Sequence, residues 1–202
     1  MTEKDTFKTI LKPSHEILFK DKNSKFFGYT FPVRTEDDVK AALSTLEKDH
    51  HKARHLCYAY QLGEDTFIYR VNDDGEPGNS AGMPIYGQIQ SFEVTNILVA
   101  VVRYFGGVKL GITGLINAYK TAAQMALEVS KIVEKTIDIN YTVYFDYESI
   151  NTVMRIIKEH NLNIVDQKLE LDCEITLAIR KSEAEQIFEI FSKVFKVNIK
   201  KR

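Results

Sequence analysis

Three carboxylates fall within four residues in the stretch Asp73-Asp74-Gly75-Glu76. Carboxylate oxygens are the ligands that Mg²⁺ and Ca²⁺ prefer, so this stretch could hold a divalent cation. It lacks the D-x-[DN]-x-[DN]-G pattern of an EF-hand loop. Acidic residues are also common in turns rich in Gly and Pro, because their side chains bond to nearby backbone amides. We favour a turn or a partner contact here over a metal site.

A second stretch with chemical potential runs from Arg103 to Tyr119 and reads RYFGGVKLGITGLINAY. It follows a β-branched apolar run at 97–102, which predicts a strand buried on both faces, and precedes the helical spacing of residues 118–130. A loop from strand to helix presents N–H groups at the positive end of the helix dipole, which favours an anion. Thr113 is expected to cap the helix. The candidate anion-binding residues are Arg103, Gly106, Gly107, Lys109, Gly111, Thr113 and Gly114.

Neither common phosphate-binding signature occurs in this stretch. A P-loop starting at Gly106 would need a lysine where Ile112 stands, and the G-x-G-x-x-G pattern is absent. The glycines could equally serve tight turns and close packing of helix on strand. Tyr104 and Phe105, beside two cations, could stack nucleobases. The structural and the anion-binding interpretations both stay open.

No complete catalytic constellation can be assembled from the sequence. His50 and His51 lie near Cys57, but no second Cys/His pair follows to complete a zinc site. His55 could move a proton, or it could simply bond to a backbone carbonyl. Cys57 falls in an apolar run, which predicts a buried and unreactive thiol. We therefore assign no catalytic residue, no metal ligand and no cofactor.

The hydrophobic pattern predicts an α+β chain in two parts. In the first part, a capping box at Thr35–Asp38 predicts a helix to about Asp49, and Pro84 is placed in the first turn of a short helix. In the second part the order is β-α-β-β-α-β, which is the ferredoxin-like motif, with a capping box expected at Ser182 and Glu185. The predicted domains are 1–132 and 133–202. The predicted strands of the first part lie at 17–19, 26–31, 57–62, 66–71 and 97–102, and a further short apolar segment lies at 7–11.

Composition excludes some partner classes. The net charge is −1 and neither half is basic, so no overall field draws the chain to nucleic acid or a membrane, and a polyanion would need a local patch. The N-terminus MTEKDTFKTI lacks the apolar core of a signal peptide. Both cysteines, Cys57 and Cys173, are expected to be small core residues and not a disulfide. We expect a cytoplasmic protein that does not enter a membrane.

Three groups of residues carry a family resemblance. The segment His55–Tyr60 is similar to the pattern H-x-C-Y-A-Y. The segment Asp73–Pro84 is similar to D-D-G-E-P…A-G-x-P. In the third group, Arg103 to Gly107, Lys109 to Gly111, Gly114-Leu115 and Ala118-Tyr119 resemble the remaining signature of the IMPACT/YigZ family. The order, the spacing and the second domain resemble bacterial two-domain members. The family-motif candidates for the site are His55, Asp73, Asp74, Glu76, Tyr104 and Tyr119.

The resemblance implies a fold for each domain. The N-terminal domain would be like domain 2 of a small-subunit ribosomal protein, with a βαβ-type sheet and helices on one face. The C-terminal domain would be ferredoxin-like and resemble a domain of elongation factor G. Eukaryotic relatives regulate translation by competing for the activator of an initiation-factor kinase, through a partner and an extra domain that this chain does not show. Bacterial relatives supply no settled activity.

The sequence also departs from the family pattern. Thr113 stands where relatives usually have glycine, and Asn117 where they often have arginine. Asn117 removes a positive charge from the start of the helix, which weakens the case for an anion site. The tripeptide Gly78-Asn79-Ser80 replaces the usual S-G-T, so a hydroxyl is kept at a shifted position.

Two functional hypotheses follow. The first is a non-enzymatic regulator that binds RNA, the ribosome or a translation-related protein through the glycine-rich loop, with added contact from 200–202. The second is a hydrolase or transferase acting on a phosphorylated substrate, in which the three carboxylates hold Mg²⁺ and His55 moves a proton. The second requires the acidic loop to lie near the glycine-rich loop. The sequence does not predict the oligomeric state, and we favour the first hypothesis.

Overall fold

The computed structural model describes residues 5–202, so the prediction about a signal peptide falls in part outside the described residues. The chain divides into two compact units. The first unit spans 7–135, and the second spans 136–202 together with the described residues 5 and 6. The predicted boundary after residue 132 falls inside strand β7 (Ile132–Thr136). No helix within residues 5–202 combines the length and the hydropathy needed to cross a membrane.

The first unit is built on a five-stranded sheet in the order β2-β3-β6-β4-β5, in which every pair of neighbours is antiparallel. Strands β3 and β4 flank β6 and are joined through α1, so the βαβ unit is split by an inserted strand. A further two-stranded sheet pairs β1 with β7. The bounds are β1 (Thr6–Ile10), β2 (Ile17–Asp21), β3 (Ser24–Pro32), α1 (Glu36–Asp49), β4 (His55–Leu62), β5 (Ile68–Asn72), α2 (Gly82–Ser91), β6 (Ile97–Tyr104) and α3 (Gly111–Glu128).

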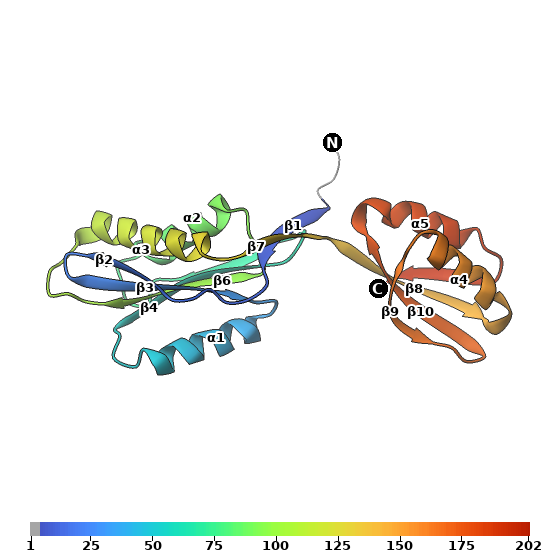
Figure 1. The fold of residues 1–202 in the computed structure, drawn as a ribbon, viewed down its shortest axis with the longest axis horizontal. Helices are drawn as coiled ribbons and strands as arrows, with labels where there is room; N and C mark the ends of the chain where they lie inside the picture. Colours follow the sequence, from blue (N-terminus) through green and yellow to red (C-terminus); the bar gives the residue numbers. More distant parts are fainter. Residues whose placement is uncertain (1–4) are drawn as a thin grey trace. The chain divides into compact units, whose positions relative to one another are not determined.

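Helices cover both faces of this sheet, with α1 on one side and α2 and α3 on the other (Figure 1). The prediction of helices on one face is therefore wrong. The reason lies in β6, where all six residues from Ile97 to Val102 are fully buried. Alternate residues point to opposite faces, so Ile97, Val99 and Val101 pack under α2 and α3 while the residues between them pack toward α1. A strand that is apolar on both faces needs a layer on each side.

Local signals at the helix ends were correct for α1 and α2 and wrong for α3. Pro84 lies in the first turn of α2, as expected. The Thr35 hydroxyl and the Asp38 carboxylate form the expected capping box of α1. Helix α3 begins earlier than expected, at Gly111, and no side chain caps its N-terminus. Thr113 lies within its first turn, so the expectation that it caps this helix is wrong. The reason is that Gly111 adopts a φ of +74°, which allows the chain to turn into the helix before Thr113.

The second unit has the predicted β-α-β-β-α-β order, and its sheet order β11-β8-β10-β9 is that of the ferredoxin-like motif. Both helices pack on one face of the sheet through a separate core. The capping box expected at Ser182 and Glu185 is wrong, because α5 starts at Ala184 without a side-chain cap and Ser182 bonds to the Asp5 carboxylate. The bounds are β8 (Asp138–Asp146), α4 (Ile150–Glu159), β9 (Asn163–Lys168), β10 (Asp172–Arg180), α5 (Ala184–Ser192) and β11 (Val197–Lys201).

Candidate functional site

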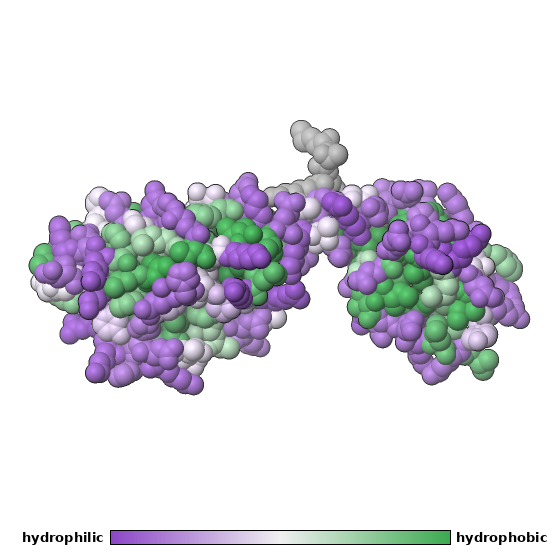
Figure 2. Space-filling view, in the orientation of Figure 1, coloured by the Kyte–Doolittle hydropathy of each residue, from purple (hydrophilic) through white to green (hydrophobic). Residues whose placement is uncertain are grey.

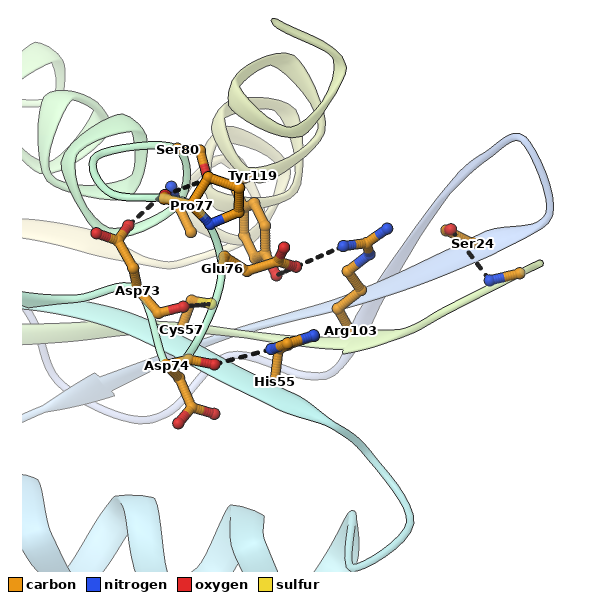
Figure 3. Close-up of polar contacts among 12 residues, drawn as sticks. Ser24, His55, Cys57, Asp73, Asp74, Glu76, Pro77, Ser80, Arg103 and Tyr119 are labelled. Atoms are coloured by element: carbon orange, nitrogen blue, oxygen red, sulfur yellow. Dashed lines mark hydrogen bonds and ion pairs between the residues drawn. The ribbon is translucent and has the colours of Figure 1, made fainter. Parts of the chain in front are cut away.

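The three motif segments converge at one end of the first unit (Figure 3). His55 and Cys57 lie on β4, Arg103 lies at the end of β6, and Tyr119 lies on α3. The acidic stretch forms the loop between β5 and α2, and this loop contacts all four of these residues. Polar residues separated by more than sixty positions thus meet in one hydrogen-bonded cluster, which we call the motif cluster: His55, Cys57, Asp73, Asp74, Glu76, Arg103 and Tyr119.

A buried ion pair forms the centre of the motif cluster. The Arg103 Nη1 donates to Glu76 Oε1 over 2.6 Å, and the side chains of Arg103 and Glu76 are only 7% and 4% exposed. The Tyr119 hydroxyl donates to the same Glu76 oxygen over 2.7 Å. The guanidinium also lies over the rings of Phe26 and Phe105, while its Nε has no hydrogen-bond partner within residues 5–202. Glu76 of the acidic loop is therefore bonded inside the protein to Arg103 on β6 and to Tyr119 on α3.

Asp73 and Asp74 hold the acidic loop in shape. The Asp73 carboxylate accepts hydrogen bonds from the backbone amides of Asn79, Ala81 and Gly82 over 2.8–3.0 Å, so it anchors the start of α2. The Asp74 carboxylate accepts from the amide of Leu56 over 2.6 Å. Such bonds are typical of aspartates in turns, and they agree with the turn interpretation of this stretch.

His55 bonds to a backbone carbonyl. Its Nδ1 lies 2.8 Å from the carbonyl oxygen of Asp74, which fixes the imidazole against the acidic loop. This is the structural alternative that the sequence left open for His55. The contact also explains why a histidine at the start of β4 and an acidic loop eighteen residues later occur in one motif set.

The acidic loop and the glycine-rich loop do meet, through the Glu76–Arg103 pair, so the proximity that the enzyme hypothesis requires is present. However, all three carboxylates accept hydrogen bonds from protein groups. Within residues 5–202, no three His, Cys, Asp or Glu side chains gather closely enough to hold a metal ion. The Glu76–Arg103 ion pair joins the acidic loop to the strand that leads into the glycine-rich loop.

Burial governs the titration of two members of the motif cluster. Cys57 is fully buried and its thiol donates to the Asp73 carbonyl over 3.1 Å. Tyr119 is also fully buried. Burial raises the pKa of the Cys57 thiol and the pKa of the Tyr119 hydroxyl well above their ordinary values, because it disfavours the charged form. Cys57 is therefore a neutral core thiol and not a nucleophile.

These raised pKa values predict a loss of stability in alkali. The fold holds both protons more tightly than the unfolded chain does, so the stabilisation is complete below the unfolded pKa values, about 8.5 for cysteine and about 10 for tyrosine, and is lost above them. We expect the free energy of unfolding in urea to fall by up to about 1.4 kcal/mol per pH unit for each group. Tyr119→Phe should show a shallower fall than wild type between pH 10 and 11, and equal slopes would contradict the role given to Tyr119.

The glycine-rich loop, residues 105–114, joins β6 to α3. Gly106 lies against the backbone of Asn23 and Ser24, and its amide donates to the Ser24 hydroxyl over 3.2 Å. A side chain at Gly114 would crowd Leu110. Close packing thus accounts for these two glycines. Gly107 and Gly111 have positive φ values of +89° and +74° with open space around them, so their role is to turn the backbone.

The surface of the glycine-rich loop carries one cation among apolar side chains. Lys109 and Thr113 are exposed. The side chains that line this surface with Lys109 are Phe105, Val108 and Ile112, which are 46%, 47% and 58% exposed. The anion-binding prediction for Lys109 and the loop amides stays a prediction. The guanidinium of Arg103 is buried in its pair with Glu76 and lies beneath this surface.

Tyr104 belongs to a different group from the rest of the motif residues. It follows Arg103 on β6 and so points to the opposite face, toward α1. There its hydroxyl lies 3.1 Å from Nδ1 of His50, and its ring packs edge-on against Phe27. His50 in turn bonds to Tyr29. The sequence predicted a helix ending near His50, but it did not predict this group, because its members come from two separate strands, β3 and β6, and a helix end.

Comparison with known proteins identifies the family. The model of the Impact N-terminal domain matches residues 22–127, which is more than half of the chain. The chain belongs to the IMPACT family. An IMPACT family member of Haemophilus influenzae is 30% identical over 90% of this chain and 88% of its own length. The IMPACT family member YvyE of Bacillus subtilis is 29% identical over 87% of this chain and 80% of its own. A crystal structure of a hypothetical protein shares the fold over 97% of both chains, with a TM-score of 0.73 at 22% identity.

Proposed function

We propose that this IMPACT-family chain is a non-enzymatic regulator related to translation, acting in the cytoplasm, and that it contacts RNA or the ribosome through the glycine-rich loop. The observation that carries the proposal is that the residues which hold the loop in place differ from the residues on its exposed surface. The polar side chains of the family motifs bond to one another and to backbone, and they brace a loop whose outer surface carries Lys109 and exposed apolar side chains. That arrangement fits contact with a partner better than a reaction.

The start of α3 supports an anionic partner. Helix α3 is eighteen residues long and has no side-chain cap, so its first backbone amides are not bonded to a capping group. Lys109 stands two residues before its first residue. Amides at the positive end of a helix dipole, with a cation beside them, suit a phosphate group. Phe105, at the other end of the loop, offers a ring on which a base can stack.

The second unit offers separate support for nucleic acid as the partner. The sheet face away from α4 and α5 bears a cavity of about 360 Å³, lined in part by Tyr144, Lys200, Lys201 and Arg202. The Lys200 ammonium lies 5.7 Å from the centre of the Tyr144 ring. A ring flanked by cations on an open sheet is a common platform for single-stranded RNA. Asp166 and Glu174 line the same cavity and would limit how close phosphates come.

The resemblance to the IMPACT/YigZ family is what directs the proposal to translation. The likenesses to a ribosomal protein domain and to a domain of elongation factor G are part of this proposal. They add little to it, because a shared fold is weak support for a shared function. No reaction is proposed, because the carboxylates that would hold Mg²⁺ are hydrogen-bonded to backbone amides, Arg103 and Tyr119.

The proposal predicts a salt-dependent effect of Lys109. RNA binding by fluorescence anisotropy should weaken in Lys109→Ala, and the slope of log affinity against log salt should become shallower by about 0.7 for the loss of one phosphate contact on a single strand. The matched control is Lys120→Ala, which removes an exposed lysine from α3 outside the loop. It should leave affinity and slope unchanged.

Two results would contradict this reading. If Lys109→Ala and Lys120→Ala bind as wild type does, the glycine-rich loop is not a phosphate contact. If wild type shows no binding at low salt, direct RNA contact is wrong, and the exposed apolar residues of the loop would then point to a translation-related protein as the partner.

A further inference from the structure

A cavity lies on the face of the first unit's sheet that α1 covers, opposite the face that holds the motif cluster. It is a cavity of about 490 Å³ between the end of α1, the turn joining β2 to β3, and the end of β6. Its size falls in the range of small-molecule sites. Of the residues in the family-motif segments, Tyr104 and Phe105 line it. The lining residues are Asn23, Lys25, Phe27, Asp49, His50, Tyr104 and Phe105.

Aromatic rings form one wall of this cavity and hold each other in place. Phe27 and Tyr104 meet edge to face with ring centres 5.7 Å apart, and His50 lies 5.4 Å from Phe27 and 5.8 Å from Tyr104. Both ring nitrogens of His50 are engaged, Nε2 with the Tyr29 hydroxyl at 2.5 Å and Nδ1 with the Tyr104 hydroxyl at 3.1 Å. The Tyr29 hydroxyl also donates to Glu16. This chain of bonds fixes the orientation of the wall before any ligand arrives.

The rim of the cavity carries one cation, one carboxylate and one amide. Lys25 faces Tyr104 directly across β3 and β6, so its ammonium is carried at the edge of the aromatic wall. Within residues 5–202, no hydrogen bond or ion pair engages the side chain of Lys25 or Asn23. Asp49 lies at the end of α1 beside His50. A planar ring system with both an amino edge and a negative group would satisfy the wall, Asp49 and Lys25 together.

We propose that this cavity binds a nucleoside phosphate whose base carries an exocyclic amino group. The base lies against the aromatic wall, its amino edge donates to Asp49 or Asn23, and its phosphate meets Lys25. A simple anion would gain nothing from the rings and would be repelled by Asp49. An uncharged aromatic compound would leave Lys25 without its counter-charge. The same chemistry can come from a free mononucleotide or from one residue of a single strand.

This proposal goes beyond RNA contact by the glycine-rich loop. The cavity shares only Phe105 with that loop, and Lys109 does not line it. Lys109→Ala should therefore leave nucleotide binding at the cavity unchanged even if it abolishes RNA binding at the loop. The two ideas can fail independently.

The test titrates the full chain with AMP, adenosine and a six-residue oligo(A), followed by calorimetry and by amide chemical shifts. AMP should shift residues 23–27, 49–50 and 104–105, and adenosine should bind about tenfold more weakly than AMP because a charged hydrogen bond is lost. Lys25→Ala should weaken AMP by a similar factor. The matched control Lys48→Ala, an exposed lysine of α1 outside the cavity, should bind as wild type does.

Each outcome decides the matter. If AMP binds with these shifts and the Lys25 effect, the free mononucleotide is a ligand. If only oligo(A) binds, with the same shifts and the same dependence on Lys25, the ligand is a residue of a single strand and the site stands. If neither shifts these residues, or if Lys25→Ala binds as wild type does while its shifts show an intact fold, the proposal is wrong.

Discussion

Replacing Glu76 with alanine should lower the free energy of unfolding by about 3–5 kcal/mol, because it leaves the buried guanidinium of Arg103 without its counter-charge. The pair is 2.6 Å apart and both side chains are almost fully buried. Arg103 Nε already lacks a partner within residues 5–202, so the loss of Glu76 would add to an existing deficit. Urea unfolding followed by circular dichroism measures the change.

Two comparisons make this prediction specific. Glu93→Ala removes an exposed pair with Lys8 and should cost no more than about 1 kcal/mol. The double change Glu76→Leu with Arg103→Met removes both charges and should restore much of the stability, since an apolar pair of similar volume avoids the desolvation of two ions. If Glu76→Ala were as mild as Glu93→Ala, the pair would not be the buried centre of the motif cluster.

Gly106→Ala should lower the free energy of unfolding by at least about 3 kcal/mol, at the upper end of the cost of overpacking. An added Cβ would overlap the backbone of Asn23 and Ser24, which cannot rotate away as a side chain would. The end of β6 would have to part from the turn between β2 and β3. Thermal and urea unfolding measure the loss, and amide exchange should show it first at that turn.

Two glycines of the same unit serve as controls. Gly107→Ala meets open space but keeps a positive φ, so only about 1–2 kcal/mol of conformational strain is expected. Gly87→Ala lies inside α2 with nothing near its Cβ, and should raise stability by about 0.5–1 kcal/mol. A loss for Gly106→Ala no larger than that for Gly107→Ala would refute the packing argument.

Hydrophobic pattern was enough to place most elements of this chain. The buried run at 97–102, the capping box at Thr35 and the alternating residues of the second unit all led to elements that the structure contains. The number of layers did not follow in the same way. The apolar residues on both sides of β6 implied two covered faces, but the resemblance suggested helices on one, and the pattern was the better guide.

Most residues of the motif cluster were named from the sequence as candidates, but their hydrogen bonds to one another were not predicted. Arg103 and Tyr104 were grouped together, although neighbours on a strand point to opposite faces, as these two do. That Asp73 binds three amides of its own loop depends on how residues 79–82 fold back, which no spacing rule specifies. Surface hydropathy does not mark the site either. Figure 2 shows hydrophilic residues distributed over the visible face with hydrophobic areas between them.

The two-stranded sheet of β1 and β7 has a consequence during synthesis on the ribosome. β1 touches residue 94 through a single bridge and gains its strand partner only when residues 132–136 arrive. At about 5–20 residues per second, that delay is roughly 6–25 s. During this time a strand with the apolar side chains of Phe7 and Ile10 keeps an unpaired edge, which is the kind of surface that joins other chains. Nascent chains stalled before residue 132 should therefore be the most prone to associate.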